Sequence, residues 1–224
     1  MAPITARASL KATRAQLVRS RAEVRRLNRH VDQLQHALEL TRVDPLTGLL
    51  TRNAWHEQAE QFIATTSGGS FVLLLDLNGF KDVNDTYGHA CGDALLEIQA
   101  QRLALWVRDR GHAGRLGGDE LVAVVELDDS ERDIASLGSI LSRPLLWNGQ
   151  QVEAPASIGV ALAAGGHGLD VLMAAADRAM YRAKVGQQRL GWWRFALDEE
   201  YAAPEAAPVH RARHRDRHAP TAAR

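Results

Sequence analysis

The segment 71–77 (FVLLLDL) constrains the fold of this 224-residue chain more than any other segment. Its apolar residues form a nearly continuous run and do not alternate with polar ones. Such a run predicts a buried central strand of a sheet. The strand ends in a carboxylate, Asp76.

Helical and strand patterns alternate on either side of this strand. Helices are expected up to about residue 65, over 90–107, and over about 130–142 and 169–185. Strands are expected in a hairpin at 114–127 around a Gly-Gly pair, within about 145–163, and at 192–195. The polar stretch 78–88 is expected to connect two elements. One sheet interleaved with helices, an α/β or α+β sandwich, is therefore predicted.

The composition suits a globular protein with a compact core, because 46% of the residues are hydrophobic. The single cysteine excludes a disulfide framework and a cysteine-based zinc site, which favours a cytoplasmic location. No apolar run approaches eighteen residues, and residues 1–14 have no apolar h-region behind their charges, so no membrane contact is expected.

Charge is unevenly distributed although the chain has 27 basic and 27 acidic side chains. Residues 1–43 carry a net charge of +6 and residues 209–224 carry +4, which leaves −10 on residues 44–208. An acidic middle disfavours nucleic acid as its partner and suits a site for divalent metal.

The N-terminal helix, expected within residues 1–43, has a heptad pattern of apolar residues. These residues are Leu10, Leu17, Val24, Leu27, Val31, Leu34 and Leu38. The stripe predicts a homodimeric coiled coil. Two alternatives are a single amphipathic helix lying on its own domain and a basic helix gripping DNA through its arginines, among them Arg25 and Arg29.

The tail, residues 197–224, is rich in Ala, Pro, Arg and His and is expected to be disordered. His210, His214 and His218 would line one face of a helix and could bind a metal. The flanking arginines and prolines disfavour that interpretation.

Three carboxylates are predicted to meet at one edge of the sheet if the hairpin pairs beside the central strand. They are Asp76, Asp119 and Glu120. Such a cluster would bind a hard, oxygen-loving cation. The alternative is that Asp119 and Glu120 are merely solvated turn residues.

Polar residues after the central strand could bind a nucleotide. Lys81 could contact phosphate, and Asn84 and Asp93 offer the amide and carboxylate that a purine edge needs. The alternatives are a surface lysine, an Asx-turn and a charge at a helix N-terminus. The motifs of P-loop, dinucleotide-binding and Ser-His-Asp proteins are missing from the sequence.

Six motifs in one order make residues 44–195 resemble the GGDEF domain of diguanylate cyclases, which condense two GTP into cyclic di-GMP. They are DPLTGLLTR (44–52), DLNGFKDVND (76–85), GHACGDALL (88–96), RLGGDEL (115–121), SIGVA (157–161) and DRAMYRAK (177–184). The resemblance implies a central antiparallel sheet wrapped by helices, as in nucleotidyl cyclases and polymerase palms. It places the domain at about residues 44–196.

The resemblance also implies roles for residues of the hairpin and the central strand. Asp76, Asp119 and the Leu77 carbonyl would bind two Mg²⁺ (or Mn²⁺) ions, Asp119 would be the base, and Glu120 would support the metal site. Gly117 and Gly118 would let the hairpin backbone approach the nucleotide.

Further residues would bind GTP. Phe80 and Lys81 match the loop that contacts the β- and γ-phosphates, and Lys184 matches a second phosphate lysine. Asn84 and Asp93 match the pair that reads guanine.

Three departures from the family pattern stand out. Leu121 replaces the phenylalanine of the GGDEF motif, and Gln187 and Gln188 replace a glycine and an arginine, with Arg189 one step late. The product-inhibition motif keeps Arg108 but has Gly111 in place of its aspartate, which predicts weak or absent inhibition by the product.

The predicted function is a Mg²⁺-dependent diguanylate cyclase that acts at a homodimer interface. The alternatives are a degenerate GGDEF module that binds GTP and signals by contact and, more distantly, a coiled-coil DNA-binding protein.

Overall fold

The structure is a computed structural model that describes residues 16, 17, 20, 21, 23–28, 42–66, 69–186 and 192–201. The chain divides into two compact units, Met1–Arg42 and Val43–Arg224. In the first unit the described residues up to Asn28 are helical, and the heptad side chains Leu17, Val24 and Leu27 are more than half exposed. The other heptad positions, Gln187 to Arg189 and the tail histidines lie outside the described residues.

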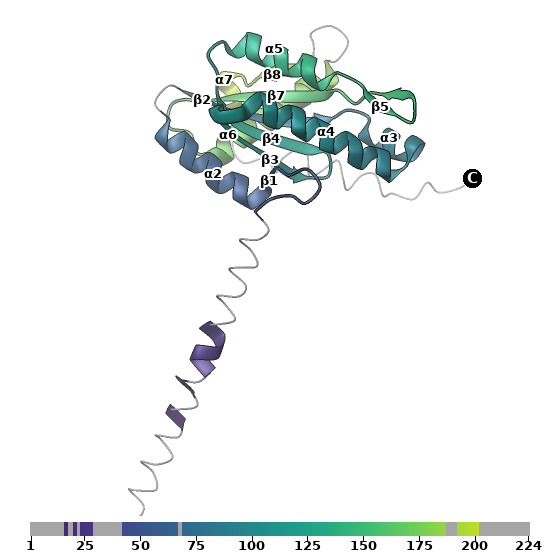
Figure 1. The fold of residues 1–224 in the computed structure, drawn as a ribbon. Helices are drawn as coiled ribbons and strands as arrows, with labels where there is room; N and C mark the ends of the chain where they lie inside the picture. The colour runs from purple at the N-terminus through teal and green to yellow at the C-terminus, as the bar shows by residue number, and fades with distance from the viewer. Residues whose placement is uncertain are drawn as a thin grey trace, which may run out of the picture. The chain divides into compact units, whose positions relative to one another are not determined.

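The second unit is built on a six-stranded sheet with the order β1-β3-β4-β2-β7-β8 (Figure 1). The strands are β1 (Leu50–Thr51), β2 (Ser70–Leu77), β3 (Gly111–Gly117), β4 (Glu120–Glu126), β7 (Ala156–Ala163) and β8 (Trp193–Phe195). β2 runs antiparallel to both β4 and β7, and only the edge pairs β1–β3 and β7–β8 are parallel. The prediction of a buried central strand is therefore confirmed. A separate small sheet pairs β5 (Leu145–Trp147) with β6 (Gln150–Val152).

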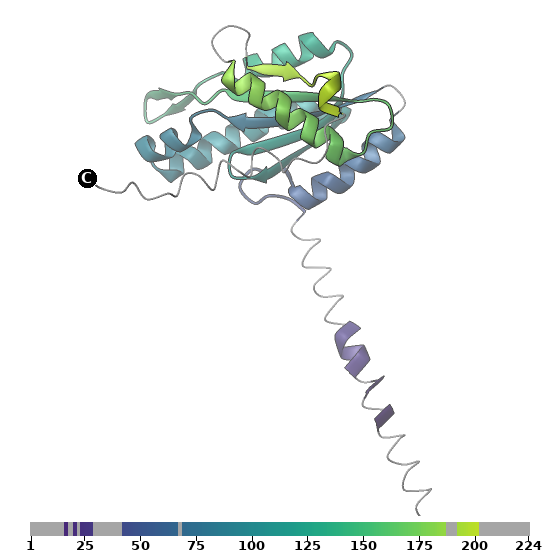
Figure 2. The ribbon, with the colours of Figure 1, turned by 180° about the vertical axis from the view of Figure 1, so that it is seen from behind.

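Helices cover both faces of the large sheet, as Figures 1 and 2 show from opposite sides. The helices are α2 (Arg52–Thr65), α3 (Phe80–Tyr87), α4 (His89–Val107), α5 (Ser130–Leu141) and α6 (Leu169–Val185). One core lies between the sheet and α3, α4 and α5, and the other lies between the sheet and α2 and α6. The predicted sandwich is confirmed.

The alternation of side chains along β2 decides where its carboxylate points. Leu73, Leu75 and Leu77 belong to the core under α4, whereas Val72 and Leu74 belong to the core under α6. Because successive side chains of a strand point to opposite faces, Asp76 lies on the α6 face.

Two α-helices form where the sequence predicted none. The polar stretch 78–88 contains the helix α3, which begins after Gly79 (φ 73°) and buries Val83 against the core. Beyond residue 197, where little was expected to be buried, α7 (Asp198–Tyr201) forms and buries Glu200. The Glu200 carboxylate pairs with Arg182 of α6, and this pair provides the stabilisation that the sequence pattern did not indicate.

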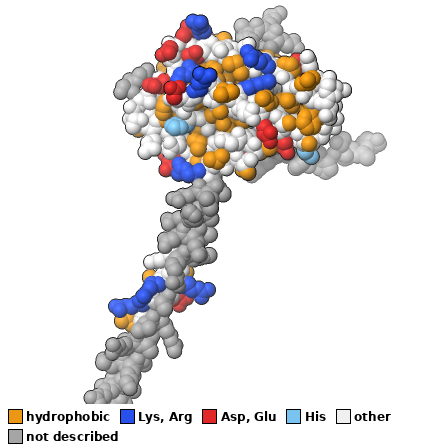
Figure 3. Space-filling view, in the orientation of Figure 1, with side chains coloured by type: hydrophobic (Ala, Val, Ile, Leu, Met, Phe, Trp, Pro, Cys, Tyr) orange, Lys and Arg blue, Asp and Glu red, His pale blue; other side chains and the backbone are white. Residues whose placement is uncertain are grey.

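The surface of the second unit mixes charged and apolar side chains on the face shown in Figure 3. Leu105 and Val185 are among the exposed apolar residues of the second unit. None of the described helices combines the length and hydropathy that a membrane span requires.

Candidate active site

Asp76 is a buried carboxylate near the end of β2 that forms an ion pair with Lys184 of α6. Its Oδ1 lies 2.5 Å from Nζ of Lys184, and only 5% of the residue is exposed. An ionised carboxylate in such a place needs a cation or several donors to offset its lost hydration. The structure thus brings together two residues to which the resemblance gave separate roles, a metal ligand and a phosphate contact.

The turn between β3 and β4 places Asp119 beside this pair. Gly117 and Gly118 have positive φ angles of 136° and 55°, which L-residues with side chains rarely adopt, so the turn needs these glycines. Glu120 is the register partner of Asp76, and the backbone N–H of Leu77 donates to the carbonyl of Asp119 over 3.4 Å. The hairpin therefore pairs directly beside the central strand, which was the condition for the three carboxylates to share one edge of the sheet.

The electrostatics of Asp119 reflect this crowding. Burial and the neighbouring Asp76 carboxylate raise the pKa of Asp119 above its ordinary value of 3.8, with a smaller contribution from Glu120. Lys184 acts in the opposite direction. A site that resists a second negative charge in this way favours the arrival of a cation.

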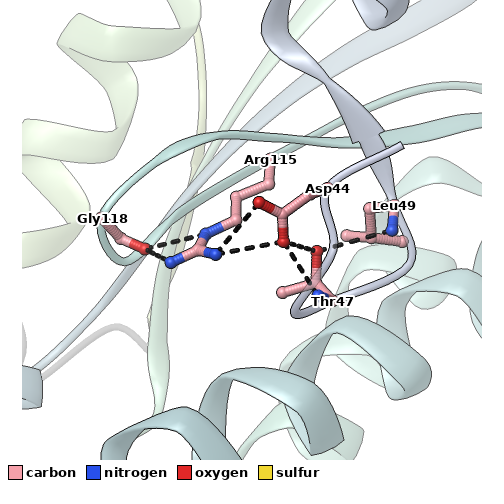
Figure 4. A network of polar contacts seen from close by, with 5 residues as sticks. All are labelled: Asp44, Thr47, Leu49, Arg115 and Gly118. Atoms are coloured by element: carbon pink, nitrogen blue, oxygen red, sulfur yellow. Dashed lines mark hydrogen bonds and ion pairs between the residues drawn. The ribbon is translucent and has the colours of Figure 1, made fainter. Parts of the chain in front are cut away.

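Two arginines hold the backbone of the turn. Arg115 donates from Nε and Nη2 to the carbonyl of Gly118 over 3.1 and 2.8 Å (Figure 4). Arg52, the first residue of α2, donates to the carbonyl of Leu116 over 2.9 and 3.1 Å. The carbonyls on both sides of Gly117 are thus fixed by side chains from outside the turn, a feature that the sequence did not predict.

The orientation of Arg115 is itself fixed by Asp44. Its carboxylate accepts from Nη1 of Arg115 at 3.1 and 3.2 Å and from the backbone N–H and hydroxyl of Thr47 (Figure 4). Burial tends to raise the pKa of Asp44, but the hydrogen bonds from Thr47 and Arg115 outweigh it and lower the pKa below 3.8. The segment 44–47, at the start of the second unit, is therefore linked to the turn that carries Asp119.

The backbone after β2 is fixed by β7. The N–H of Asn78 donates to the carbonyl of Pro155 over 2.8 Å, and its Oδ1 accepts from the hydroxyl of Ser157 over 2.9 Å. These contacts fix the peptide between Leu77 and Asn78, whose carbonyl oxygen is the predicted backbone ligand. Asn78 and Ser157 fall within quoted motifs, but neither was assigned a role.

The corner between α3 and α4 brings Asn84 close to Asp93. A Cβ at Gly92 would lie 2.0 Å from Oδ1 of Asn84, so the amide packs directly on the residue before Asp93. Lys81 and Asp93 are exposed, and Phe80 is half-buried at the start of α3. Within the described ranges, no hydrogen bond or ion pair joins Lys81 or Asp93 to Asp76 or Asp119.

The donor set fits a hard cation. Asp76, Asp119 and Glu120 share one edge of the sheet, but among the described residues no three His, Cys, Asp or Glu side chains converge on one point. The three carboxylates are therefore neighbours, as expected, but do not form a ready-made metal cluster. Two carboxylates and a backbone carbonyl are nevertheless oxygen ligands of the kind that Mg²⁺ prefers, and the ammonium group of Lys184 already occupies a cation position on Asp76.

The stretch that resembles the product-inhibition motif, Arg108 to Gly111, lies at the end of α4. Arg108 has a φ of 47°, and its Nε donates to the carbonyl of Leu105. Gly111 follows the 3₁₀ turn η1 (Arg108–Arg110), and a Cβ at this position would lie 1.9 Å from the carbonyl oxygen of Val124. An aspartate could enter here only if the neighbouring strand moved.

Comparison with protein families identifies this arrangement. Residues 41–189 match the family model described as "Diguanylate cyclase, GGDEF domain". The chain belongs to the GGDEF family. A 19.3 kDa protein from the repSA 5′ region of Streptomyces ambofaciens is 43% identical over 164 residues, which span 72% of this chain and 88% of that protein. Diguanylate cyclase DgcP from Pseudomonas aeruginosa is 35% identical over 71% of this chain and 24% of its own length.

Solved GGDEF structures have the same fold. A sensory box/GGDEF family protein from Caulobacter crescentus matches with a TM-score of 0.60 and 36% identity, over 65% of this chain and 99% of that chain. The coiled coil and GGDEF domain of DgcB from the same organism, solved with c-di-GMP, match with a TM-score of 0.62 and 25% identity. That match covers 83% of this chain and 98% of that chain. This chain spans about a quarter of DgcP, so the activity of this member is a separate question.

Proposed function

We propose that this GGDEF protein is a diguanylate cyclase that converts two GTP into cyclic di-GMP and two pyrophosphates. The observation that carries the proposal is the pairing of Asp76 with Lys184 beside Asp119, at the junction of β2 and the GGDEF hairpin. Each new bond joins the 3′-oxygen of one GTP to the α-phosphorus of the other. The hydroxyl loses its proton and pyrophosphate leaves.

Asp76, Asp119 and the Leu77 carbonyl would hold two Mg²⁺ (or Mn²⁺) ions. When bound, such metals supply positive charge to the triphosphate and acidify the attacking hydroxyl. Asp119 would accept the hydroxyl proton, and Glu120, opposite Asp76 on the next strand, would support the site. Lys184 lies beside Asp76, so its ammonium group is placed to contact a phosphate bound near that carboxylate.

The corner between α3 and α4 would bind the rest of GTP. Asp93 and Asn84 would recognise guanine, because a carboxylate accepts hydrogen bonds from its N1–H and 2-amino groups and adenine lacks this pair of donors. Phe80 and Lys81, at the start of α3, would contact the β- and γ-phosphates. The packing of Asn84 on Gly92 supports a shared role for Asn84 and Asp93.

Catalysis requires two copies of the chain, because each domain would hold one GTP and two bonds must form between them. The N-terminal heptads would bring the copies together. The exposed apolar side chains of Leu17, Val24 and Leu27 support this role, since a solvated stripe of this kind gains stability when a second helix covers it.

Incubation of the full chain with GTP and Mg²⁺, followed by chromatography of the nucleotides, tests the proposal. We expect cyclic di-GMP to accumulate with the wild-type chain and with Glu153→Gln, an exposed carboxylate that lies outside the six motifs. The Asp119→Asn variant should form no cyclic di-GMP. GTP binding without any product would favour the degenerate module, for which the glutamine at position 188 is the main sequence argument.

A further inference from the structure

A pocket of about 500 Å³ lies at the opposite end of β2 from Asp76. Its apolar lining includes Phe71 of β2, Leu162 of β7 and Phe195 of β8. None of the residues proposed for GTP or metal binding lines it. The pocket is therefore separate from the proposed GTP and metal site.

One wall of the pocket is built by the C-terminal helix α7. The hydroxyl of Tyr201 accepts a hydrogen bond from the N–H of Leu162 over 2.7 Å, and its ring stacks on His167 with 5.2 Å between the ring centroids. Glu200, which is buried, ties α7 to Arg182 of α6. The α7 residues follow the segment 41–189 that matches the GGDEF family model.

The rim of the pocket is acidic. Glu131 and Asp198 line it, both are exposed, and neither forms an ion pair with a described residue. Asp128, Asp129 and Glu199 are exposed neighbours of these two residues in the sequence.

The chemistry of the pocket selects a cation with an apolar stem. Carboxylates at the rim attract a positive charge, aromatic faces accept a guanidinium, and the apolar floor accepts methylene groups. An arginine side chain has all of these properties and stays charged at every physiological pH.

We propose that this pocket binds the arginine-rich segment 211–217 (RARHRDR) of the same chain, independently of the proposed cyclase activity. Arginine occupies every second position of this segment, so an extended backbone would present all four guanidinium groups on one side. The segment starts ten residues after Tyr201, and ten residues span at most about 33–36 Å. A tether this short gives the segment an effective concentration in the millimolar range at the pocket.

Zero-length cross-linking tests where the segment binds. The tail beyond Tyr201 has no lysine, so Arg213→Lys in the full chain introduces a single amine that carbodiimide can join to a carboxylate in direct contact. We expect links from position 213 to Glu131 or Asp198. With a mixture of isotope-labelled and unlabelled chains, these links should lie within one chain. Arg224→Lys is the matched control and should give only background links.

Either of two outcomes would overturn the proposal. Links from position 213 at the background level of Arg224→Lys would show that the segment does not bind in the pocket. Links only between labelled and unlabelled chains would show that a second copy provides the ligand.

Tryptic cleavage of the full chain provides a second test. Binding should protect the bonds after the four arginines, so Glu131→Gln/Asp198→Asn should speed their cleavage about five-fold, the effect of losing modest surface ion pairs. Glu153→Gln/Asp109→Asn, which changes two exposed carboxylates outside the pocket lining, should cleave at the wild-type rate. Equal cleavage rates in all three chains, with equal melting temperatures, would contradict the proposal.

Discussion

The turn that carries Asp119 and the corner that carries Asn84 and Asp93 are held in very different ways. The turn is fixed from three sides, by Arg52, by Arg115 and by its contact with the end of β2. In the corner, Asn84 lies on α3, a helix of eight residues with one buried side chain, Val83, and Asp93 is an exposed residue near the start of α4.

This difference indicates that the turn and the corner have different tasks in the proposed site. Groups that must act on reacting atoms need positions fixed to a fraction of an ångström before the substrate arrives. Groups that recognise a base can stay solvated and be ordered by the ligand, at some cost in affinity. Changes in the turn should therefore lower kcat, and changes in the corner should raise KM.

The largest effect is expected from the carboxylate in the fixed turn. Asp119→Asn keeps the size of the side chain but removes a negative charge, a proton acceptor and a metal ligand. We expect turnover of GTP to fall about a thousand-fold or more with an unchanged melting temperature. Pyrophosphate release measures the rate. Activity within ten-fold of wild type would contradict the assignment of Asp119.

A smaller loss is expected when the turn keeps its carboxylate but loses its support. Arg115→Ala removes two hydrogen bonds to Gly118 and leaves Asp44 without its ionic partner, which should destabilise the protein by about 1–3 kcal/mol. Displacement of the turn should lower kcat about ten- to a hundred-fold with little change in KM.

Arg52→Ala is the matched control for this variant, because Arg52 binds one carbonyl of the same turn and is exposed. Its effect on unfolding and on kcat should be smaller. Equal effects of the two substitutions, or a change in KM alone for Arg115→Ala, would show that the Arg115 network does not position the turn.

Substitutions in the corner should change KM for GTP. Asp93→Asn replaces the proposed acceptor for guanine with an amide, which should raise KM for GTP about ten-fold and leave the melting temperature unchanged, since Asp93 is exposed. Glu97→Gln, one turn further along α4 and also exposed, should behave as wild type. If Asp93→Asn lowered kcat and left KM unchanged, the division between turn and corner would be wrong.

The smallest effect concerns pH. Because the folded-state pKa of Asp44 is lowered, its ionised form stabilises the native state at pH values above the ordinary pKa of about 3.8. That stabilisation is lost as the pH falls through the folded-state pKa. Asp44→Asn should cost about 1 kcal/mol near neutral pH, and the difference from wild type should shrink below pH 4. Urea unfolding at several pH values measures it. A difference that grew on acidification would have the wrong sign.

The sequence predicted the local features of this fold better than its long-range contacts. The apolar run of β2 and the Gly-Gly hairpin were predictable because their signals lie within a few residues. The bond between Asp44 and Arg115 joins positions 71 residues apart, and the Asp-Pro pair at its start has the pattern of a simple breaker. Proximity of this kind depends on the topology of the sheet, which no local pattern specifies.

The same limit applies to the short elements. α3 is polar on most of its surface, so its sequence is typical of a connecting segment, and only the burial of Val83 shows why it is helical. α7 is stabilised by the ion pair between Glu200 and Arg182, which lies on the preceding helix α6. The role of Lys184 was implied by family resemblance alone, and its contact with Asp76 is visible only in three dimensions.

The central claim is that the fixed turn carries out phosphodiester formation between two GTP molecules. Its most direct test is the stoichiometry of the reaction of the full chain with GTP and Mg²⁺, measured by quantifying pyrophosphate and cyclic di-GMP in the same samples. We predict two pyrophosphates for each cyclic di-GMP throughout the time course, and neither product from Asp119→Asn. Pyrophosphate or phosphate without cyclic di-GMP, or unchanged GTP, would contradict the claim.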